Sequence, residues 1–135
     1  MGNARLARIY NKLYRHFGKQ NWWPAKTRLE VIVGAVLTQN TAWPNVEKAI
    51  SNLRRRKLLS FRRLVRLNTR SLANFIRPAG YFNIKSRRLK NVLNFIQGEY
   101  GGSLARMQNS EPSRTRGKLL NVNGVGPETA DSILL

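Results

Sequence analysis

The residues best suited to chemistry lie near the end of the chain, where residues 123–126 read Asn-Gly-Val-Gly. Two glycines around one aliphatic residue favour a tight hairpin, because glycine adopts a positive φ without steric cost and lets another backbone come close. Pro127 suits the first position of a following helix, and Glu128 suits the positive end of that helix dipole. Outward backbone N–H groups of such a hairpin can bind a phosphate. An ordinary turn between two helices is the alternative.

Other side chains that could recognise a ligand are polar or aromatic. Residues 38–41, Thr-Gln-Asn-Thr, follow directly on an apolar segment, so they form either a site on a rigid support or a solvent-exposed turn. Trp22 and Trp23 are either core anchors or a surface on which bases stack. Tyr81 stands at a turn after Gly80.

The charge of the chain points to a polyanionic partner. Its 135 residues contain 25 Lys and Arg against 6 Asp and Glu, which gives a net charge of +19. Such a charge destabilises a compact state unless a polyanion binds it, and nucleic acid is the first expectation. An anionic membrane is the second, but no apolar run is long enough to span a bilayer. The absence of cysteine excludes disulfides and thiolate sites within these residues, and one histidine excludes a multi-histidine metal site. We expect an intracellular, cytoplasmic, nucleoid-associated protein.

Two groups of cations have distinct settings. Lys85, Arg87, Arg88 and Lys90 crowd the N-terminal half of an expected helix over residues 83–100, where cations oppose the helix dipole. We interpret this group as facing phosphate. The run over residues 54–57 is either a solvated helix end or a further phosphate contact.

The elements that position these residues all have helical periodicity. The pattern predicts an all-α fold of about seven or eight helices, formed as one incomplete domain over residues 1–135. We expect helices over residues 3–17, over residues 27–37 with a Thr27–Glu30 capping box, from Trp43, after a Ser60 cap, from Ser71, over residues 83–100, and from Pro112 into the hairpin. Residues 103–111 are expected to form a polar connector.

Three separated segments resemble the endonuclease III-like branch of the helix-hairpin-helix (HhH-GPD) DNA glycosylase superfamily. Residues 33–41 resemble its early helix and loop, residues 80–85 with Arg88 and Leu89 resemble its loop of glycine, hydrophobic residue, Tyr, Asn and Lys, and residues 122–130 resemble its helix-hairpin-helix motif. Their order and spacing match over roughly residues 20–135. The Trp-Trp-Pro segment, the Leu-Thr-Gln-Asn-Thr segment and Trp43 are most similar to bacterial 3-methyladenine glycosylases of that branch.

The resemblance implies an enzyme that turns a damaged base out of double-stranded DNA before cutting its glycosidic bond. Gln39 and Tyr81 fall on the residues that fill the vacated space. The other implied DNA contacts are Lys85, Arg88, Asn123, Gly124, Val125, Gly126 and Thr129. The implied base pocket is Trp22, Trp23 and Trp43, whose faces attract a cationic alkylated purine. Backbone carbonyls of Leu120, Val122 and Val125 are implied ligands for a monovalent cation, Na⁺ or K⁺.

The chain departs from this pattern where catalysis is concerned. Glu128 occupies the position of the lysine that attacks the sugar in bifunctional members, and a carboxylate cannot form that imine. We therefore expect monofunctional hydrolysis by a monomer. No catalytic residue is expected within the chain: the family's aspartate would lie beyond Leu135, Asp131 does not match it, and a 4Fe-4S cluster would need downstream cysteines. The alternatives are a non-catalytic helix-hairpin-helix module and a bifunctional lyase acting on oxidised pyrimidines.

Overall fold

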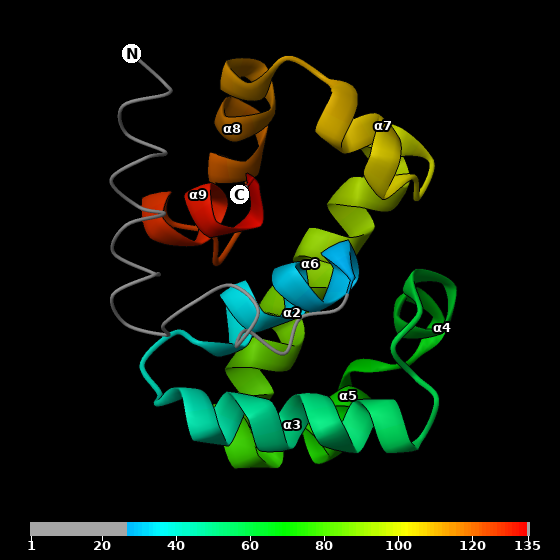
Figure 1. The fold of residues 1–135 in the computed structure, drawn as a ribbon, viewed down its shortest axis with the longest axis vertical. Helices are drawn as coiled ribbons and strands as arrows, with labels where there is room; N and C mark the ends of the chain where they lie inside the picture. Colours follow the sequence, from blue (N-terminus) through cyan, green and yellow to red (C-terminus); the bar gives the residue numbers. More distant parts are fainter. Residues whose placement is uncertain (1–26, 135) are drawn as a thin grey trace.

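The computed structural model describes residues 27–134, and these residues form eight α-helices and one short 3-10 helix without any strand. In chain order the elements are α2 (Arg28–Leu37), α3 (Trp43–Arg55), α4 (Phe61–Arg66), α5 (Thr69–Phe75), the 3-10 helix η2 (Arg77–Ala79), α6 (Phe82–Tyr100), α7 (Leu104–Asn109), α8 (Pro112–Leu120) and α9 (Pro127–Leu134). The all-α prediction is therefore confirmed (Figure 1). The helix expected over residues 3–17 lies outside the described residues.

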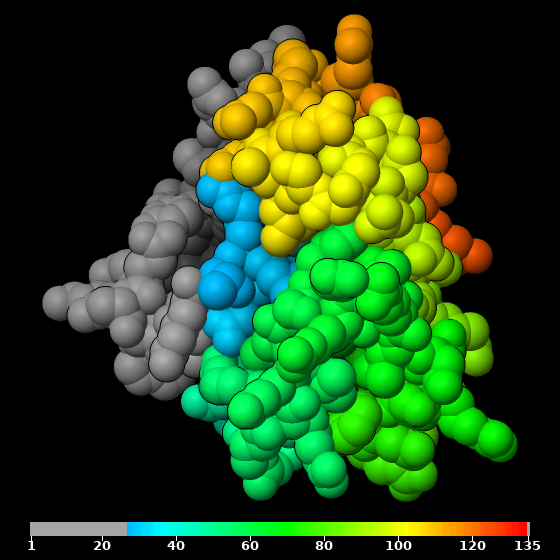
Figure 2. Space-filling view, turned by 90° about the vertical axis from the view of Figure 1, so that its right-hand side faces the viewer, coloured from blue at the N-terminus to red at the C-terminus, as the bar shows by residue number. Residues whose placement is uncertain are grey.

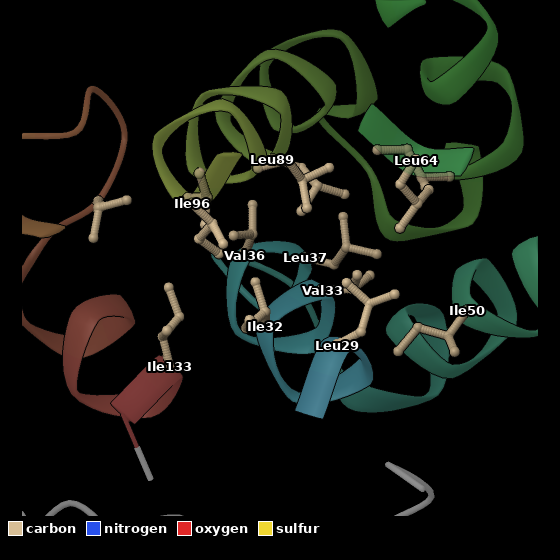
Figure 3. Close-up of a cluster of buried hydrophobic side chains, with 14 of the residues drawn as sticks. Leu29, Ile32, Val33, Val36, Leu37, Ile50, Leu64, Leu89, Ile96 and Ile133 are labelled. Atoms are coloured by element: carbon tan, nitrogen blue, oxygen red, sulfur yellow. The ribbon is translucent and has the colours of Figure 1, made fainter. Parts of the chain in front are cut away.

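The α2 helix is central and contacts α3, α6 and α9. Its sequence is apolar nearly all round, so it can be buried on several sides at once. Figure 3 shows its Ile32, Val33 and Val36 among side chains from the neighbouring helices, including Leu89 of α6 and Ile133 of α9. Each fully buried aliphatic side chain of this kind stabilises the fold by about 1.5–3 kcal/mol. The core thus fixes the end of α2, from which Gln39 projects.

Capping residues set most of the helix starts. The Thr27 hydroxyl accepts the Glu30 N–H at 3.2 Å, as the sequence predicts, and the Glu30 carboxylate accepts a hydrogen bond from Arg54 at 2.5 Å. Ser60 caps α4 as predicted. The prediction for Ser71 is wrong by two residues: α5 begins at Thr69, because the Asn68 side chain accepts the Ser71 N–H at 2.8 Å.

The predicted polar connector over residues 103–111 contains the helix α7. Two features of its sequence explain the difference. The Ser103 hydroxyl accepts the Arg106 N–H at 3.1 Å and so caps the helix, while Met107 is buried against the core. Leu104 and Met107 lie three residues apart, but two larger apolar side chains in six residues are too short a periodic signal to predict a helix from sequence alone.

Candidate nucleic-acid interface

The helices α8 and α9 form a helix-hairpin-helix pair (Figure 1) and are held together by a buried ion pair. Arg116 Nε lies 2.7 Å from Asp131 Oδ1, and the Asp131 side chain is 1% exposed. The hydrogen bond to Asp131 raises the pKa of Arg116 above its ordinary value. Asp131 therefore serves as the partner of Arg116 inside the motif, and the position of the catalytic aspartate stays a prediction.

The two glycines of the hairpin have different structural roles. Gly124 has a φ of +95°, and a Cβ atom built there would lie 2.3 Å from Cγ of Arg88. Gly126 is not among the residues with positive φ, and a Cβ there would meet no heavy atom within 4 Å. The expectation of positive φ thus holds for Gly124 alone. Gly124 lets α6 approach the hairpin, whereas Gly126 leaves open space in front of it.

The outward side of the hairpin keeps donors available for an anion. The N–H groups of Gly124 and Gly126 donate to no other group within residues 27–134. They stand at the start of α9, where the helix dipole favours negative charge. The hairpin therefore has the donors that the predicted phosphate contact requires.

Gln39 joins the loop after α2 to this hairpin. Its Nε2 atom donates to the Gly124 carbonyl oxygen at 3.1 Å and to Thr129 Oγ1 at 2.8 Å. Its Oε1 atom accepts a hydrogen bond from Arg88 at 2.7 Å. Four residues predicted as DNA contacts, from three distant segments, thus share one network. In this conformation the Gln39 amide fixes the hairpin instead of extending away from it.

Tyr81 projects from the start of α6 and is 66% exposed. Two consecutive positive φ values, +72° at Gly80 and +44° at Tyr81, turn the chain before the helix begins. A left-handed conformation at a non-glycine residue costs about 1–2 kcal/mol and is concentrated at functional sites. An exposed aromatic ring on a strained turn fits the predicted wedge, which stays a prediction.

Lys85 does not face a phosphate in this structure, so its prediction as a DNA contact is corrected. It is 1% exposed, and its Nζ atom donates to the Leu37 carbonyl at 2.9 Å and to the Ala79 carbonyl at 2.7 Å. These carbonyls end α2 and η2, and cations are favourable at helix C-termini. Burial, together with the nearby charge of Arg88, lowers the pKa of Lys85 to about 8. The ammonium group therefore links the loops that carry Gln39 and Tyr81.

The rest of the cation group on α6 also differs from the sequence interpretation. Lys90 donates to the carbonyls of Leu64 and Val65 at the end of α4, and burial lowers its pKa. Arg88 is half-buried against Gln39. Of the four cations, Arg87 alone is exposed. Three of the four cations bind acceptors on neighbouring elements. These contacts offset the unfavourable interaction with the dipole of their own helix.

Of the three tryptophans predicted as a base pocket, only Trp43 lies within the described residues. Trp43 is 5% exposed and belongs to the hydrophobic core, so its ring is not presented to a ligand and its assignment to the base pocket is corrected. Trp22 and Trp23 lie outside the described residues. Their assignment to a base pocket stays a prediction.

Some contributors to the site were not found from the sequence. Asn91 Nδ2 donates to the Asn123 carbonyl at 3.1 Å and so adds a second link between α6 and the hairpin. The only sequence signal was its position three residues after Arg88, on the same face of α6. The sequence indicates the Arg116–Asp131 pair even less clearly than Asn91, because the two residues lie on different helices.

Two kinds of site find no support in the described part of the chain. No helix there is long and apolar enough to cross a membrane. No three His, Cys, Asp or Glu side chains within residues 27–134 gather as a group that could hold a metal ion.

Comparison with known proteins gives consistent results. Residues 33–126 match the model of the HhH-GPD superfamily base excision DNA repair protein. The chain is 50% identical over 131 residues to a Methanocaldococcus jannaschii protein provisionally named DNA repair glycosylase MJ1434. It is 26% identical over 111 residues to the chloroplastic endonuclease III homolog 2 of Arabidopsis thaliana, covering 82% of this chain and 27% of that protein. The H. pylori 3-methyladenine DNA glycosylase MagIII, solved bound to 1,N6-ethenoadenine, superposes with a TM-score of 0.77 at 28% identity.

These matches cover nearly all of this chain but only part of each relative. The alignment covers 96% of this chain and 60% of the Methanocaldococcus protein, and 98% of this chain and 63% of the H. pylori chain. The chain therefore spans less than two thirds of the length of these relatives.

Proposed function

The chain belongs to the HhH-GPD superfamily of base excision DNA repair proteins, and we propose that it is the DNA-binding part of a monofunctional glycosylase. The proposed substrate is double-stranded DNA with a damaged, alkylated base. The proposed reaction is hydrolysis of the N-glycosidic bond, in which water replaces the base on the sugar. The catalytic aspartate is placed after residue 135, as the family resemblance implies.

The observation that carries the proposal is the network around Gln39. Gln39, Arg88, Gly124 and Thr129 are separated by up to 90 residues in sequence, yet direct hydrogen bonds join them. An isolated turn between two helices needs no such contacts to other elements. Their convergence supports a single surface on which the hairpin, the Gln39 loop and the start of α6 act together.

Each part of this surface has a role that its chemistry supports. The hairpin N–H groups bind a backbone phosphate, and Gly126 leaves the space for the strand to approach. Tyr81 inserts beside the base that loses its partner, because its ring is exposed and already oriented away from the protein. Gln39 fills the vacated space, which requires it to release its bonds to the hairpin when DNA binds. Trp22 and Trp23 receive the extruded base.

The reaction is proposed to proceed without a Schiff base. Glu128 follows Pro127 in the first turn of α9 and is exposed. A Schiff base requires an amine, and the Glu128 carboxylate has none. Strand cleavage by the lyase route is therefore absent. Treatment with borohydride should therefore trap no adduct between this protein and DNA.

A monovalent cation is proposed at the carbonyls of Leu120, Val122 and Val125. The two carbonyls between Val122 and Val125 already accept hydrogen bonds from side chains. Asn91 donates to the Asn123 carbonyl, and Gln39 donates to the Gly124 carbonyl. The three proposed carbonyls receive no such side-chain donor within the described residues, which fits a cation. When bound, Na⁺ or K⁺ would add positive charge behind the hairpin and strengthen its hold on phosphate.

The test compares this chain with a chimera in which the remainder of the Methanocaldococcus protein follows residue 135. Duplexes with and without 3-methyladenine are incubated with each protein, and both binding and released base are measured. We expect both proteins to bind duplex DNA and only the chimera to release the methylated base.

The intact Methanocaldococcus protein serves as the positive control for release. If the chimera binds duplex as tightly as that protein but releases no base where that protein does, this segment is a binding module without a role in excision. If neither this chain nor the chimera binds duplex, the proposed DNA-binding function itself is wrong.

A further inference from the structure

A groove of about 410 Å³ lies along α6, next to the hairpin, and shares Arg88 with the network around Gln39. We call it the α6 groove. Its lining residues are Thr69, Ile84, Arg87, Arg88, Lys90, Asn91, Asn94 and Asn123. Seven of these eight side chains are polar, and none is acidic. Small-molecule pockets of about 300–1,000 Å³ are mostly apolar, so this lining is better suited to an extended polar chain.

The groove lies in a part of the sequence with a single sign of charge. Residues 48–98 contain fourteen of the 25 Lys and Arg and none of the six Asp and Glu. Much of this segment forms the green surface of α3 to α5 in Figure 2. No carboxylate of the segment competes for the cations, so the potential over the groove favours an anion.

Most cations around the groove already have acceptors, and this distinguishes Arg87. Lys90 and Arg88 bind groups of the protein itself. Arg87 is exposed and makes no hydrogen bond or ion pair with any residue of the described range. Asn94, seven residues later on the same face of α6, is also exposed and has no such partner within residues 27–134. Both side chains are therefore available to a ligand.

The groove continues the surface of the hairpin. Asn123 belongs to both, since it lines the groove and its carbonyl accepts a hydrogen bond from the Asn91 amide. Arg87 and Asn94 are two helical turns apart, or about 10.5 Å along the axis. That distance corresponds to about three steps of a DNA strand at about 3.4 Å each.

We propose that the α6 groove binds the sugar–phosphate backbone of the same DNA strand that the hairpin holds, with Arg87 and Asn94 as its contacts. The inference rests on the proposed DNA-binding function. It adds a second length of backbone contact, a few nucleotides from the hairpin. It also gives the exposed Arg87 a role that the internal contacts of α6 do not supply.

The absence of cysteine in the chain allows a direct test by cross-linking. Single variants Gly126→Cys and Asn94→Cys each carry one thiol, the first in the hairpin and the second in the groove. Each is mixed with duplexes that carry a disulfide tether on one chosen phosphate of either strand. The protein thiolate attacks the tether, forms a protein–DNA disulfide and releases the small thiol. Gln108→Cys on the exposed side of α7 is the matched control.

We expect Gly126→Cys and Asn94→Cys to trap the same strand, at positions a few nucleotides apart, and Gln108→Cys to trap neither strand. Trapping of the opposite strand by Asn94→Cys, or of no strand while Gly126→Cys is trapped, overturns the groove proposal alone. If Gly126→Cys still binds duplex but is not trapped on any phosphate, the failure lies in the proposed contact of the hairpin and not in the groove.

A second measurement uses the charge of Arg87. The logarithm of the binding constant falls with the logarithm of the salt concentration, and Arg87→Ala should make this slope less steep by about one. Arg106→Ala on α7 should leave the slope unchanged. Equal slopes for Arg87→Ala and the parent contradict the contact. A nucleoside monophosphate at millimolar concentration should not block trapping of Asn94→Cys. If it does so without affecting Gly126→Cys, the groove is a small-anion site and the proposal is wrong.

Discussion

The hairpin and the Tyr81 turn are both predicted to touch DNA, but they are built in opposite ways. The hairpin is tied to the rest of the molecule: Gly124 packs on Arg88, Gln39 binds it from the loop after α2, and Asp131 binds α8 to α9. Tyr81 instead projects into solvent from a strained turn. A hairpin held in this way can present backbone donors without reorganising, whereas an exposed ring can enter a duplex.

Because the two regions are built differently, substitutions in them should affect different quantities. In the hairpin, a change of side chain alters both folding and binding, because the same atoms serve both. At Tyr81, a change should leave folding intact and affect the distinction between damaged and undamaged DNA. Substitutions in each region can therefore separate these effects.

The largest effect is expected for Gly124→Ala, with Gly126→Ala as its matched control. At Gly124 the methyl group meets Arg88 and the backbone keeps a φ of +95°, so we expect a loss of about 2–5 kcal/mol in unfolding free energy. At Gly126 the methyl group enters open space, so stability should change by at most about 0.5 kcal/mol while duplex affinity falls. Urea unfolding and fluorescence anisotropy measure the two quantities. Equal stability losses would contradict the division of roles.

Asp131→Asn should destabilise the hairpin by about 3 kcal/mol, because the substitution leaves Arg116 without its buried charged partner. The effect should appear as a lower urea midpoint. Glu99→Gln is the control, since Glu99 pairs with Lys118 where both side chains are about 40% exposed, and such a pair contributes at most about 1 kcal/mol. If the two variants are equally stable, the Arg116–Asp131 pair does not hold α8 to α9.

Lys85 should make stability depend on pH, because its pKa is about 8 in the folded chain against an ordinary value of 10.5. Between these values the unfolded chain binds a proton at Lys85 that the folded chain does not, so stability from this group rises with pH. Over that window the parent should gain about 1–3 kcal/mol relative to Lys85→Met. Below pH 8 the difference between the two proteins should be constant. A constant difference across the entire range would show that Lys85 titrates normally.

The smallest effect on folding is expected for Tyr81→Ala, within about 0.5 kcal/mol, because the ring is exposed. Its effect should appear in selectivity, measured as the ratio of affinities for a duplex with an abasic-site analogue and an undamaged duplex. Ile84→Ala, one turn along α6 and 40% exposed, controls for loss of apolar surface. Equal loss of affinity for both duplexes in Tyr81→Ala would contradict the wedge.

Much of the fold and part of the site could be predicted from local patterns. The caps at Thr27 and Ser60, the start of α3 and the glycine hairpin all depend on residues close together in sequence, and the structure contains each of them. Two local predictions failed, the helix start at Ser71 and the connector over residues 103–111. In the site, the prediction that failed depends on distant partners. Lys85 was assigned to phosphate from its helix position, but its acceptors are carbonyls 48 and 6 residues away.

The amino-acid sequence alone specified the helical class and the glycine hairpin, and its net charge of +19 favours a polyanionic partner. It also determined, through Glu128, that an imine cannot form at the family's lysine position. Only the tertiary structure decided which cations reach solvent. The ends of α2, η2 and α4 meet α6 with carbonyls that no intrahelical N–H can satisfy, and the nearest lysines on α6 are drawn in to satisfy them. Arg87, which no such carbonyl meets, stays exposed.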